Sequence, residues 1–267
     1  MSFRYTHAIV SRIPLSLKTR NIDVDIAKKE HEAYVQLLRE LELDVIEMPS
    51  DEELPESVFV EDTAVVCNNI ALITKPGNPS RLKEVENVRA ILKKELDMAI
   101  VEIADPKAKL EGGDVLFTGK EFFVGISEFT NEAGARAVAN AFPEFPCVPI
   151  RVTEKRHLKY YVSMAGPDLI CVSNSPASQG ILKRIEREAT FTYQTLTLSE
   201  ENASNVLFVN GFLVHRSIEE IPVTTQILSE KIDIPRKVLN ISELGKYSSG
   251  LTSCCVLVRR TRYIRNL

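Results

Sequence analysis

The feature that most constrains the fold is a pattern of elements that recurs four times along the chain. Each copy predicts two strands joined by a tight turn, then a polar loop and a helix. The second strands begin at Ala71, Phe122, Leu169 and Phe212, a period of about 43 to 51 residues. The helices that follow are expected at residues 83–96, 132–141, 179–188 and 224–231. Periods in this range are typical of repeat architectures, in which each repeat is one supersecondary unit.

The two ends of the chain supply the parts of a further unit. Residues 7–10 and 43–48 predict strands on either side of an amphipathic helix at 25–41, and an apolar run after Cys255 predicts a last strand. Joining the ends would close about five blades into a ring whose loops meet at a centre. An open sheet with helices on both faces is the alternative. Since no Pro/Gly/Ser-rich linker divides the chain, we expect a single domain over residues 1–267.

Composition is that of a soluble globular enzyme and argues against several other classes. A net charge of −4 gives no support for a nucleic-acid partner. The five cysteines show no C-x-x-C or Cys/His metal spacing, and reduced thiols in the cytosol are the simplest account of them. No signal region opens the chain, and no apolar run approaches bilayer-spanning length. We therefore expect a cytoplasmic protein that does not span a membrane.

Near the C-terminus, small polar residues lead into two adjacent cysteines, Cys254 and Cys255, and then into a β-branched apolar run. This order places a thiol where a loop becomes a buried strand, a position that suits a nucleophile. Because neighbouring strand residues point to opposite faces, only one of the two thiols is expected to face a site. A free cysteine also behaves as a small buried hydrophobe, so a purely structural role stays open for either residue.

A thiol nucleophile needs a histidine and a carboxylate as partners, and His157 and Glu111 are the candidates. His157 lies in a polar segment that enters a predicted strand at residues 160–162, where it can serve as a general acid and base. Glu111 and Asp114 flank two glycines directly before another predicted strand. A solvated turn and a surface histidine explain these residues equally well from local sequence alone.

A second pair of acids, Glu61 and Asp62, interrupts the strand-like apolar segment 58–67. Adjacent carboxylates are rarely buried unless another group pairs with them. Their place before an inner strand corresponds to that of Glu111 and Asp114 in the next repeat, which favours a shared site.

Five motifs occur in the order and register of one known family. They are Phe59-Val60-Glu61-Asp62, Pro76-Gly77-Asn78-Pro79-Ser80-Arg81, Glu111-Gly112-Gly113-Asp114-Val115-Leu116, His157-Leu158-Lys159, and Gly250 with Cys254 four residues later. Each is weak alone, but together they cover nearly the whole chain, which resembles the dimethylarginine dimethylaminohydrolases of the pentein superfamily. The resemblance implies a five-bladed α/β propeller of ββαβ-type repeats around a central active site, in agreement with the repeat pattern.

The resemblance also implies a reaction and its residues. The expected enzyme converts N-methylated arginine to citrulline and methylamine through a covalent thiouronium intermediate, needs no metal or organic cofactor, and is linked in that family to nitric-oxide regulation. Cys254 is implied as the nucleophile, with Cys255 as the alternative, His157 as the acid and base, and Glu111 as the carboxylate that orients His157. The substrate-binding residues that it implies are Asp62 and Glu61 for the guanidinium, Arg81 for the carboxylate, Glu56 for the amine, and Asp114 and Ser248. Zinc held by Cys254 and His157 would be inhibitory.

Several positions depart from the family pattern. Phe129 stands where active relatives have a second carboxylate-binding arginine, and phenylalanine cannot form a charge-assisted pair. Glu56 replaces the usual aspartate, Val256 replaces a serine, and the loop at 16–24 is shorter than the vertebrate lid. These changes weaken the amino-acid anchor and leave the implied nucleophilic machinery complete.

Three functions therefore stay open. The chain is a hydrolase of methylated arginines, a hydrolase of another guanidino compound, or a low-activity paralogue that acts as a binding or regulatory protein. The expected partner is a small guanidino molecule, without nucleic acid or membrane, and the expected assembly is a monomer or a homodimer.

Overall fold

Each predicted repeat folds into one three-stranded sheet and one longer helix in the computed structural model, which describes residues 4–247 and 250–260. In every sheet the inner strand pairs antiparallel with the middle strand, and the middle strand pairs parallel with the outer strand. The parallel pair requires a crossover, which the helix provides. The four internal repeats are β3 (Ala64–Cys67), β4 (Ile70–Ile73), α2 (Leu82–Lys94) and β5 (Ala99–Val101); β6 (Val115–Phe117), β7 (Phe122–Ile126), α3 (Glu132–Ala141) and β8 (Cys147–Arg151); β9 (Val162–Gly166), β10 (Leu169–Ser173), α5 (Pro176–Glu188) and β11 (Gln194–Leu198); and β12 (Leu207–Val209), β13 (Phe212–Arg216), α6 (Pro222–Lys231) and β14 (Arg236–Leu239).

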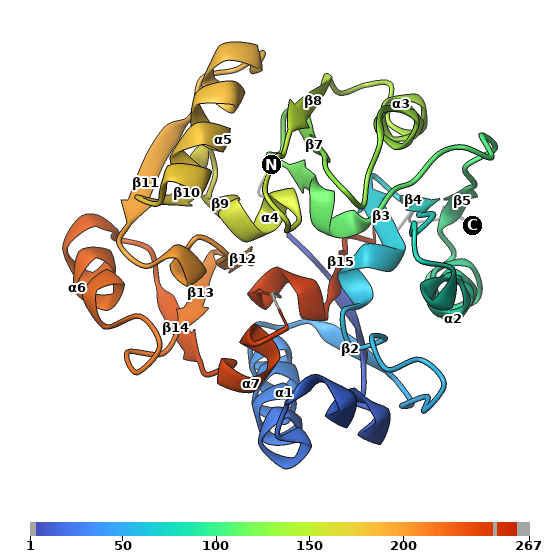
Figure 1. Ribbon diagram of the computed structural model, residues 1–267, viewed down its shortest axis with the longest axis horizontal. Helices are drawn as coiled ribbons and strands as arrows, with labels where there is room; N and C mark the ends of the chain where they lie inside the picture. The colour runs from blue at the N-terminus through green and yellow to red at the C-terminus, as the bar shows by residue number, and fades with distance from the viewer. Residues whose placement is uncertain (1–3, 248–249, 261–267) are drawn as a thin grey trace, which may run out of the picture.

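The fifth sheet joins the two ends of the chain, as predicted. It has the order β15 (Val256–Val258), β1 (His7–Ser11) and β2 (Asp44–Met48), and α1 (Val24–Glu40) connects β1 to β2. β15 runs antiparallel to β1, with His7 opposite Val258. Figure 1 shows the sheets arranged around a common centre, with α1, α2, α3, α5 and α6 on the outside. The prediction of a five-bladed α/β propeller is confirmed, and the open-sheet alternative is wrong.

Local sequence explains the tight turns and the helix starts. Asn68 and Asn69, between β3 and β4, and Asn210 and Gly211, between β12 and β13, all have positive φ angles, which Asn and Gly adopt most readily. The side chain of Asp23 accepts the Asp25 and Ile26 N–H groups at the start of α1. These signals fix the tight turns of two repeats and the start of α1.

A short helical turn precedes each inner strand, and these five turns position the site. They are η2 (Val60–Thr63), η4 (Gly112–Asp114), α4 (Leu158–Tyr161), η5 (Glu201–Ala203) and η6 (Leu251–Cys254). The strands predicted over 58–67 and 160–162 are therefore wrong in their first part, because η2 and α4 occupy it. In a 3₁₀ helix, successive side chains point about 120° apart instead of alternating, so neighbouring residues face different surroundings.

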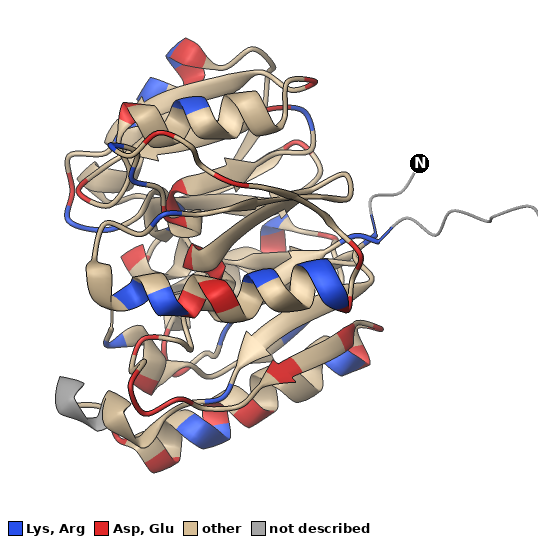
Figure 2. Cartoon of the chain, turned by 90° about the vertical axis from the view of Figure 1, so that its right-hand side faces the viewer, with Lys and Arg blue, Asp and Glu red and all other residues tan. Residues whose placement is uncertain are grey.

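The remaining short helices are η1 (Leu15–Arg20), η3 (Pro79–Arg81) and α7 (Ser242–Gly245). Acidic and basic positions are interspersed over the helices in the view of Figure 2. Among the described residues, no helix combines the length and the apolar character needed to cross a bilayer.

Candidate active site

A cavity of about 480 Å³ lies where the segments around η2, η4, α4 and η6 meet, and we call it the acidic cavity. The predicted site residues that line it are Glu56, Asp62, Arg81, Glu111 and His157. Phe129 and Ser253 line it as well. Residues separated by almost 200 positions in the sequence thus share one site, because the segments that lead into β3, β6, β9 and β15 meet there.

His157 is held by carboxylates at the start of α4. Its Nε2 lies 2.8 Å from Glu111 Oε2 and 3.8 Å from Asp62 Oδ1. Asp114 accepts the backbone N–H of Leu158 at 2.8 Å and so fixes the turn that carries the histidine. Gly113 allows this close approach, since a Cβ at that position would lie 2.8 Å from both Asp62 Oδ1 and His157 Cγ.

This environment favours the imidazolium form of His157. Burial alone would lower its pKa, but the Asp62 carboxylate and the hydrogen bond with Glu111 outweigh burial and raise the pKa to about 9. Burial would raise the pKa of Asp62, but His157 and Arg81 together lower it below its ordinary value. Near neutral pH the pair is therefore an imidazolium beside a carboxylate. The imidazolium can donate a proton to a departing amine.

The phenyl ring of Phe129 packs on the imidazole ring of His157. Their ring centroids are 4.3 Å apart, and the ring planes are inclined by 30°. The aromatic residue thus covers one face of His157 and supplies an apolar wall, where the family pattern implied a cation.

Arg81 lies in the cavity, with its guanidinium turned onto the acids. Its Nη1 donates to Asp62 Oδ2 at 2.7 Å, and its Nη2 donates to Glu84 Oε2 at 2.8 Å. Only 6% of the residue is exposed. Arg81 is thus in the predicted cavity, although in this arrangement it serves as a partner of Asp62.

The predicted nucleophile is not at the cavity. Cys254 is 1% exposed and packs in the hydrophobic core beside α1, whereas Ser253 lines the acidic cavity. The strand alternation assumed for the cysteine pair does not apply, because η6 is a 3₁₀ turn. Thr252, Ser253 and Cys254 consequently face three different surroundings. Burial raises the pKa of the Cys254 thiol well above its ordinary range, which opposes thiolate formation.

Cys255, the alternative nucleophile, lines a second cavity of about 160 Å³. Residues of all five inner strands line this space, which we call the central cavity. The Cys255 thiol lies 3.1 Å from the hydroxyl of Tyr34, and its pKa is raised to about 12, mainly by burial. Neither predicted thiol is therefore in contact with the acidic cavity in the part of the chain that the structure describes.

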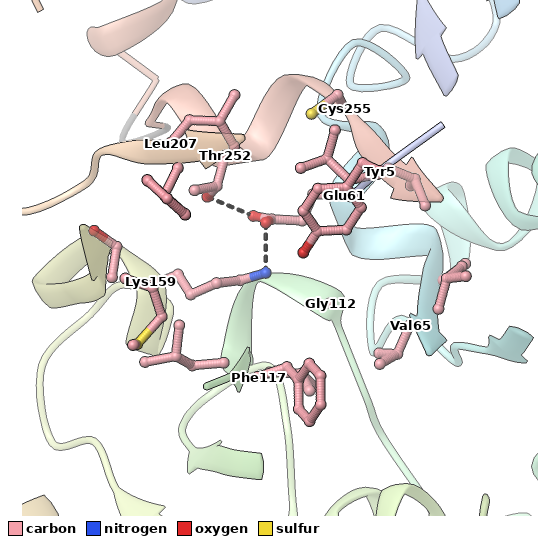
Figure 3. A pocket seen from close by; sticks show the side chains of 18 of the residues that line it. Tyr5, Glu61, Val65, Gly112, Phe117, Lys159, Leu207, Thr252 and Cys255 are labelled. Atoms are coloured by element: carbon pink, nitrogen blue, oxygen red, sulfur yellow. Dashed lines mark hydrogen bonds and ion pairs between the residues drawn. The ribbon is translucent and has the colours of Figure 1, made fainter. Parts of the chain in front are cut away.

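Glu61 also faces the central cavity and not the predicted guanidinium site. It accepts a hydrogen bond from Thr252 at 3.0 Å and forms an ion pair with Lys159, as Figure 3 shows. Glu61 and Asp62 are neighbours on η2, and the turn directs them into different cavities. The structure therefore does not bring Glu61 to the cavity that Asp62 lines.

Two further predictions need correction. Asp114 is fully buried and accepts hydrogen bonds from Leu158 and Ser127, so it organises the loops and does not line the acidic cavity. The predicted zinc pair is separated, since Cys254 lies in the core and His157 in the cavity. Ser248 lies outside the described residues. Asp62, Glu111 and His157 each offer one atom that could bind a metal ion, and these three atoms lie within 4.8 Å of one another. The Arg81 guanidinium donates a hydrogen bond to Asp62 of this group.

Sequence reasoning missed three residues of the site. Ser253 was read as part of the approach to the cysteines, Tyr247 donates its hydroxyl to Glu56, and Glu84 holds Arg81 from behind. None of the three carried a usable signal in the sequence, since the direction of Ser253 depends on the phase of the short 3₁₀ turn η6.

The family model described as eukaryotic N,N dimethylarginine dimethylhydrolase matches residues 13–206. The human protein named putative hydrolase DDAH2 is 35% identical over 271 residues, which cover 96% of this chain and 95% of that protein. A dimethylarginine dimethylaminohydrolase of Streptomyces coelicolor is 28% identical over 245 residues, which cover 91% of this chain and 90% of that protein.

A solved structure of the Pseudomonas aeruginosa dimethylarginine dimethylaminohydrolase, a cysteine-to-serine variant complexed with citrulline, has the same fold. It superposes with a TM-score of 0.82 at 23% identity and covers 96% of this chain and 100% of that one.

Proposed function

The chain belongs to the eukaryotic dimethylarginine dimethylhydrolase family, and on that premise we propose that its acidic cavity binds guanidino compounds of the methylated-arginine class and hydrolyses them at the guanidinium carbon. The observation that carries the proposal is the contact of His157 with Glu111 beside Asp62. This set offers acceptors for a planar cation and a proton for its leaving amine. The relative complexed with citrulline supports a ligand of this size and chemistry.

The proposed reaction assigns each group a proton or a charge. Asp62 accepts N–H groups of the substrate guanidinium, and His157, oriented by Glu111, protonates the dimethylamine as its bond to the guanidinium carbon breaks. An oxygen nucleophile adds to that carbon in place of the amine, and its proton passes to the imidazole that has given one up. Water supplies the oxygen found in citrulline, either as the nucleophile itself or by hydrolysing the C–O bond formed with Ser253. The imidazolium form favoured at neutral pH suits the protonation step.

The nucleophile distinguishes this site from the cysteine mechanism that the sequence suggested. Ser253, not Cys254, lines the cavity, so the attacking group is the Ser253 hydroxyl or a water molecule beside it. An alcohol or water is a much weaker nucleophile than a thiolate near neutral pH. We therefore expect slow turnover.

The same observation favours a second candidate function, that of a guanidino-ligand-binding or regulatory protein. A carboxylate-lined cavity needs no nucleophile to hold a cation. The Pseudomonas relative with serine in place of a cysteine is complexed with citrulline, which supports binding without a thiol. In either case we place the protein in the cytoplasm, which agrees with its free cysteines.

Citrulline release from asymmetric dimethylarginine tests both candidates. We expect Ser253→Cys to release citrulline about tenfold faster than wild type or more, because it puts a thiol on the cavity wall. Cys254→Ser should release citrulline at the wild-type rate. His157→Ala should abolish citrulline release both in the wild-type protein and in the Ser253→Cys variant.

Binding of dimethylarginine without citrulline from wild type would select the binding protein. No binding by wild type and no release by Ser253→Cys would end both candidates. Loss of a measurable wild-type activity in Cys254→Ser would instead restore Cys254 as the nucleophile.

A further inference from the structure

The guanidinium of Arg81 already occupies the acceptors that the proposed function assigns to a ligand. Besides Asp62 and Glu84, it reaches the Phe59 carbonyl oxygen, to which Nη2 donates at 3.1 Å. Its Nη1 lies 3.7 Å from Glu111 Oε2, and its Nε lies 3.5 Å from Glu56 Oε2. Three carboxylates that line the acidic cavity and Glu84 behind them are therefore arranged around one guanidinium, which belongs to the protein.

A second guanidinium would compete with Arg81 for these acceptors. Asp62 gives Oδ2 to Arg81, and its Oδ1 accepts the Gly113 N–H at 2.9 Å. Two like charges within a few ångströms repel strongly in a buried site, where the effective dielectric is low. A guanidino ligand must therefore either stay out or displace Arg81.

We propose that Arg81 is an internal occupant of the guanidinium site and that ligands enter by exchange. The ligand guanidinium replaces that of Arg81 on Asp62, and a carboxylate on the same ligand binds the displaced Arg81. The inference rests on the proposed function and adds an internal competitor to it, since every guanidino ligand must displace Arg81 before it reaches Asp62. Simple guanidines offer the displaced Arg81 no new partner and should therefore bind more weakly than ligands that carry a carboxylate.

The surroundings of Arg81 permit the exchange. Arg81 ends the short helix η3, and Asp62 and Glu84 hold it from two sides. Glu84 is 4% exposed, and burial raises its pKa to about 7 despite Arg81, so this carboxyl can take up a proton when the guanidinium leaves. The departure of Arg81 therefore need not leave an uncompensated buried charge at Glu84.

Other cations do not take over this role. Lys109 and Lys155 line the cavity but are exposed, and Arg156 packs over the Tyr160 ring with its guanidinium carbon 4.2 Å from the ring centroid. They can attract a carboxylate to the mouth of the cavity, but their movement does not vacate Asp62. Phe129 supplies no charge. The exchange therefore depends on Arg81.

Calorimetric titration with methylguanidine and with N-monomethylarginine tests the inference in wild type, Arg81→Gln and Glu84→Gln. Wild type should bind methylarginine, and its affinity for methylguanidine should be at least about tenfold weaker. Arg81→Gln should bind methylguanidine about tenfold more tightly than wild type and lose the preference for methylarginine. Methylguanidine should also raise the melting temperature of Arg81→Gln, because it restores the missing cation to buried acids.

Glu84→Gln is the matched variant, because Glu84 contacts Arg81 without lining the cavity. It keeps Arg81 and holds it less tightly, so methylarginine affinity should rise several-fold. If Arg81→Gln does not fold, an unchanged methylarginine affinity in Glu84→Gln overturns the inference. If wild type binds methylarginine, but wild type and Arg81→Gln bind methylguanidine with equal affinity, the inference is overturned and the proposed function is left intact. No methylarginine binding by wild type overturns the proposed function and the exchange with it.

Discussion

Three consecutive residues of η6 face three surroundings, and this assigns the chemistry of the site to single positions. Thr252 binds Glu61 in the central cavity, Ser253 lines the acidic cavity, and Cys254 packs in the core. A shift of one residue would exchange a hydroxyl for a thiol on the cavity wall. The difference between a fast nucleophile and a slow one thus depends on the phase of one helical turn.

Cys254→Ser should therefore act on stability and not on the site. A hydroxyl placed among apolar side chains lacks a partner and should lower the free energy of unfolding by about 1 to 3 kcal/mol. Urea unfolding measures this loss, and titration with methylarginine should give the wild-type affinity. Ser253→Ala is the matched control and should alter ligand binding more than stability. A Cys254→Ser protein with full stability would contradict the buried position.

Glu111→Gln should lower the pKa of His157. The variant keeps the shape of the side chain and loses the charge that holds the imidazolium at 2.8 Å. NMR titration of the His157 ring should have its midpoint near pH 9 in wild type and about one unit lower or more in the variant.

The same shift implies a sign for the pH dependence of stability. Because the folded-state pKa of His157 lies above its unfolded value of 6.5, its contribution is complete below about pH 6.5 and is lost as pH rises through 9. Glu111→Gln should therefore show a smaller loss of stability over that window than wild type. An equal loss of stability in both proteins would mean that a group other than His157 releases its proton over this pH window.

At the scale of elements, the repeat could be predicted because its signals are long. Helices such as α1 and the paired strands on either side of tight turns extend over enough residues to show a period, and the structure confirms them. The turns η2 and α4 are only four residues each, too short to show a period, so the sequence predicts strands there.

The same short turns explain which site residues could be predicted. Sequence motifs placed Asp62, Glu111 and His157 in one cavity correctly, since the motifs mark the inner end of each repeat. The direction of each side chain depends on the phase of its turn, which no motif encodes. Glu61 and Cys254 were therefore assigned to the wrong surroundings.

Gly112→Ala should disrupt the contact between η4 and η2. A Cβ on Gly112 would lie 2.0 Å from the Glu61 carbonyl oxygen, and that backbone cannot move without shifting Asp62. We expect a loss of about 3 kcal/mol or more in the free energy of unfolding, measured by urea unfolding. Gly180→Ala is the control, because its Cβ meets nothing within 4 Å inside α5. Gly180→Ala should raise the free energy of unfolding by about 0.5 to 1 kcal/mol. A similar loss of stability in both variants would contradict the close approach of Gly112 to the Glu61 backbone.

At the scale of the whole molecule, the ring is closed by contacts between the two ends of the chain. β15 is the inner strand of the sheet that also contains β1, and one core cluster joins Val256 and Val258 to Val60 and Val85 of the next repeat. Another cluster joins α1 to Leu207 and Val214 of the last repeat. The closing sheet therefore contacts both neighbours, and no sheet in the described part of the chain depends on local contacts alone.

Val258→Ala tests whether this closure makes the ring one cooperative unit. Val258 is fully buried, and removing its two methyl groups should cost about 2 kcal/mol. If the ring unfolds as a unit, the slowest-exchanging amides of β4, β7, β10 and β13 should all lose protection by about thirtyfold in native-state hydrogen exchange, although they lie in other sheets. Val223→Ala, at an exposed position of α6, should leave every rate unchanged. Faster exchange confined to β1, β2 and β15 would instead identify the closing sheet as a separate unit that opens while the other four sheets stay folded.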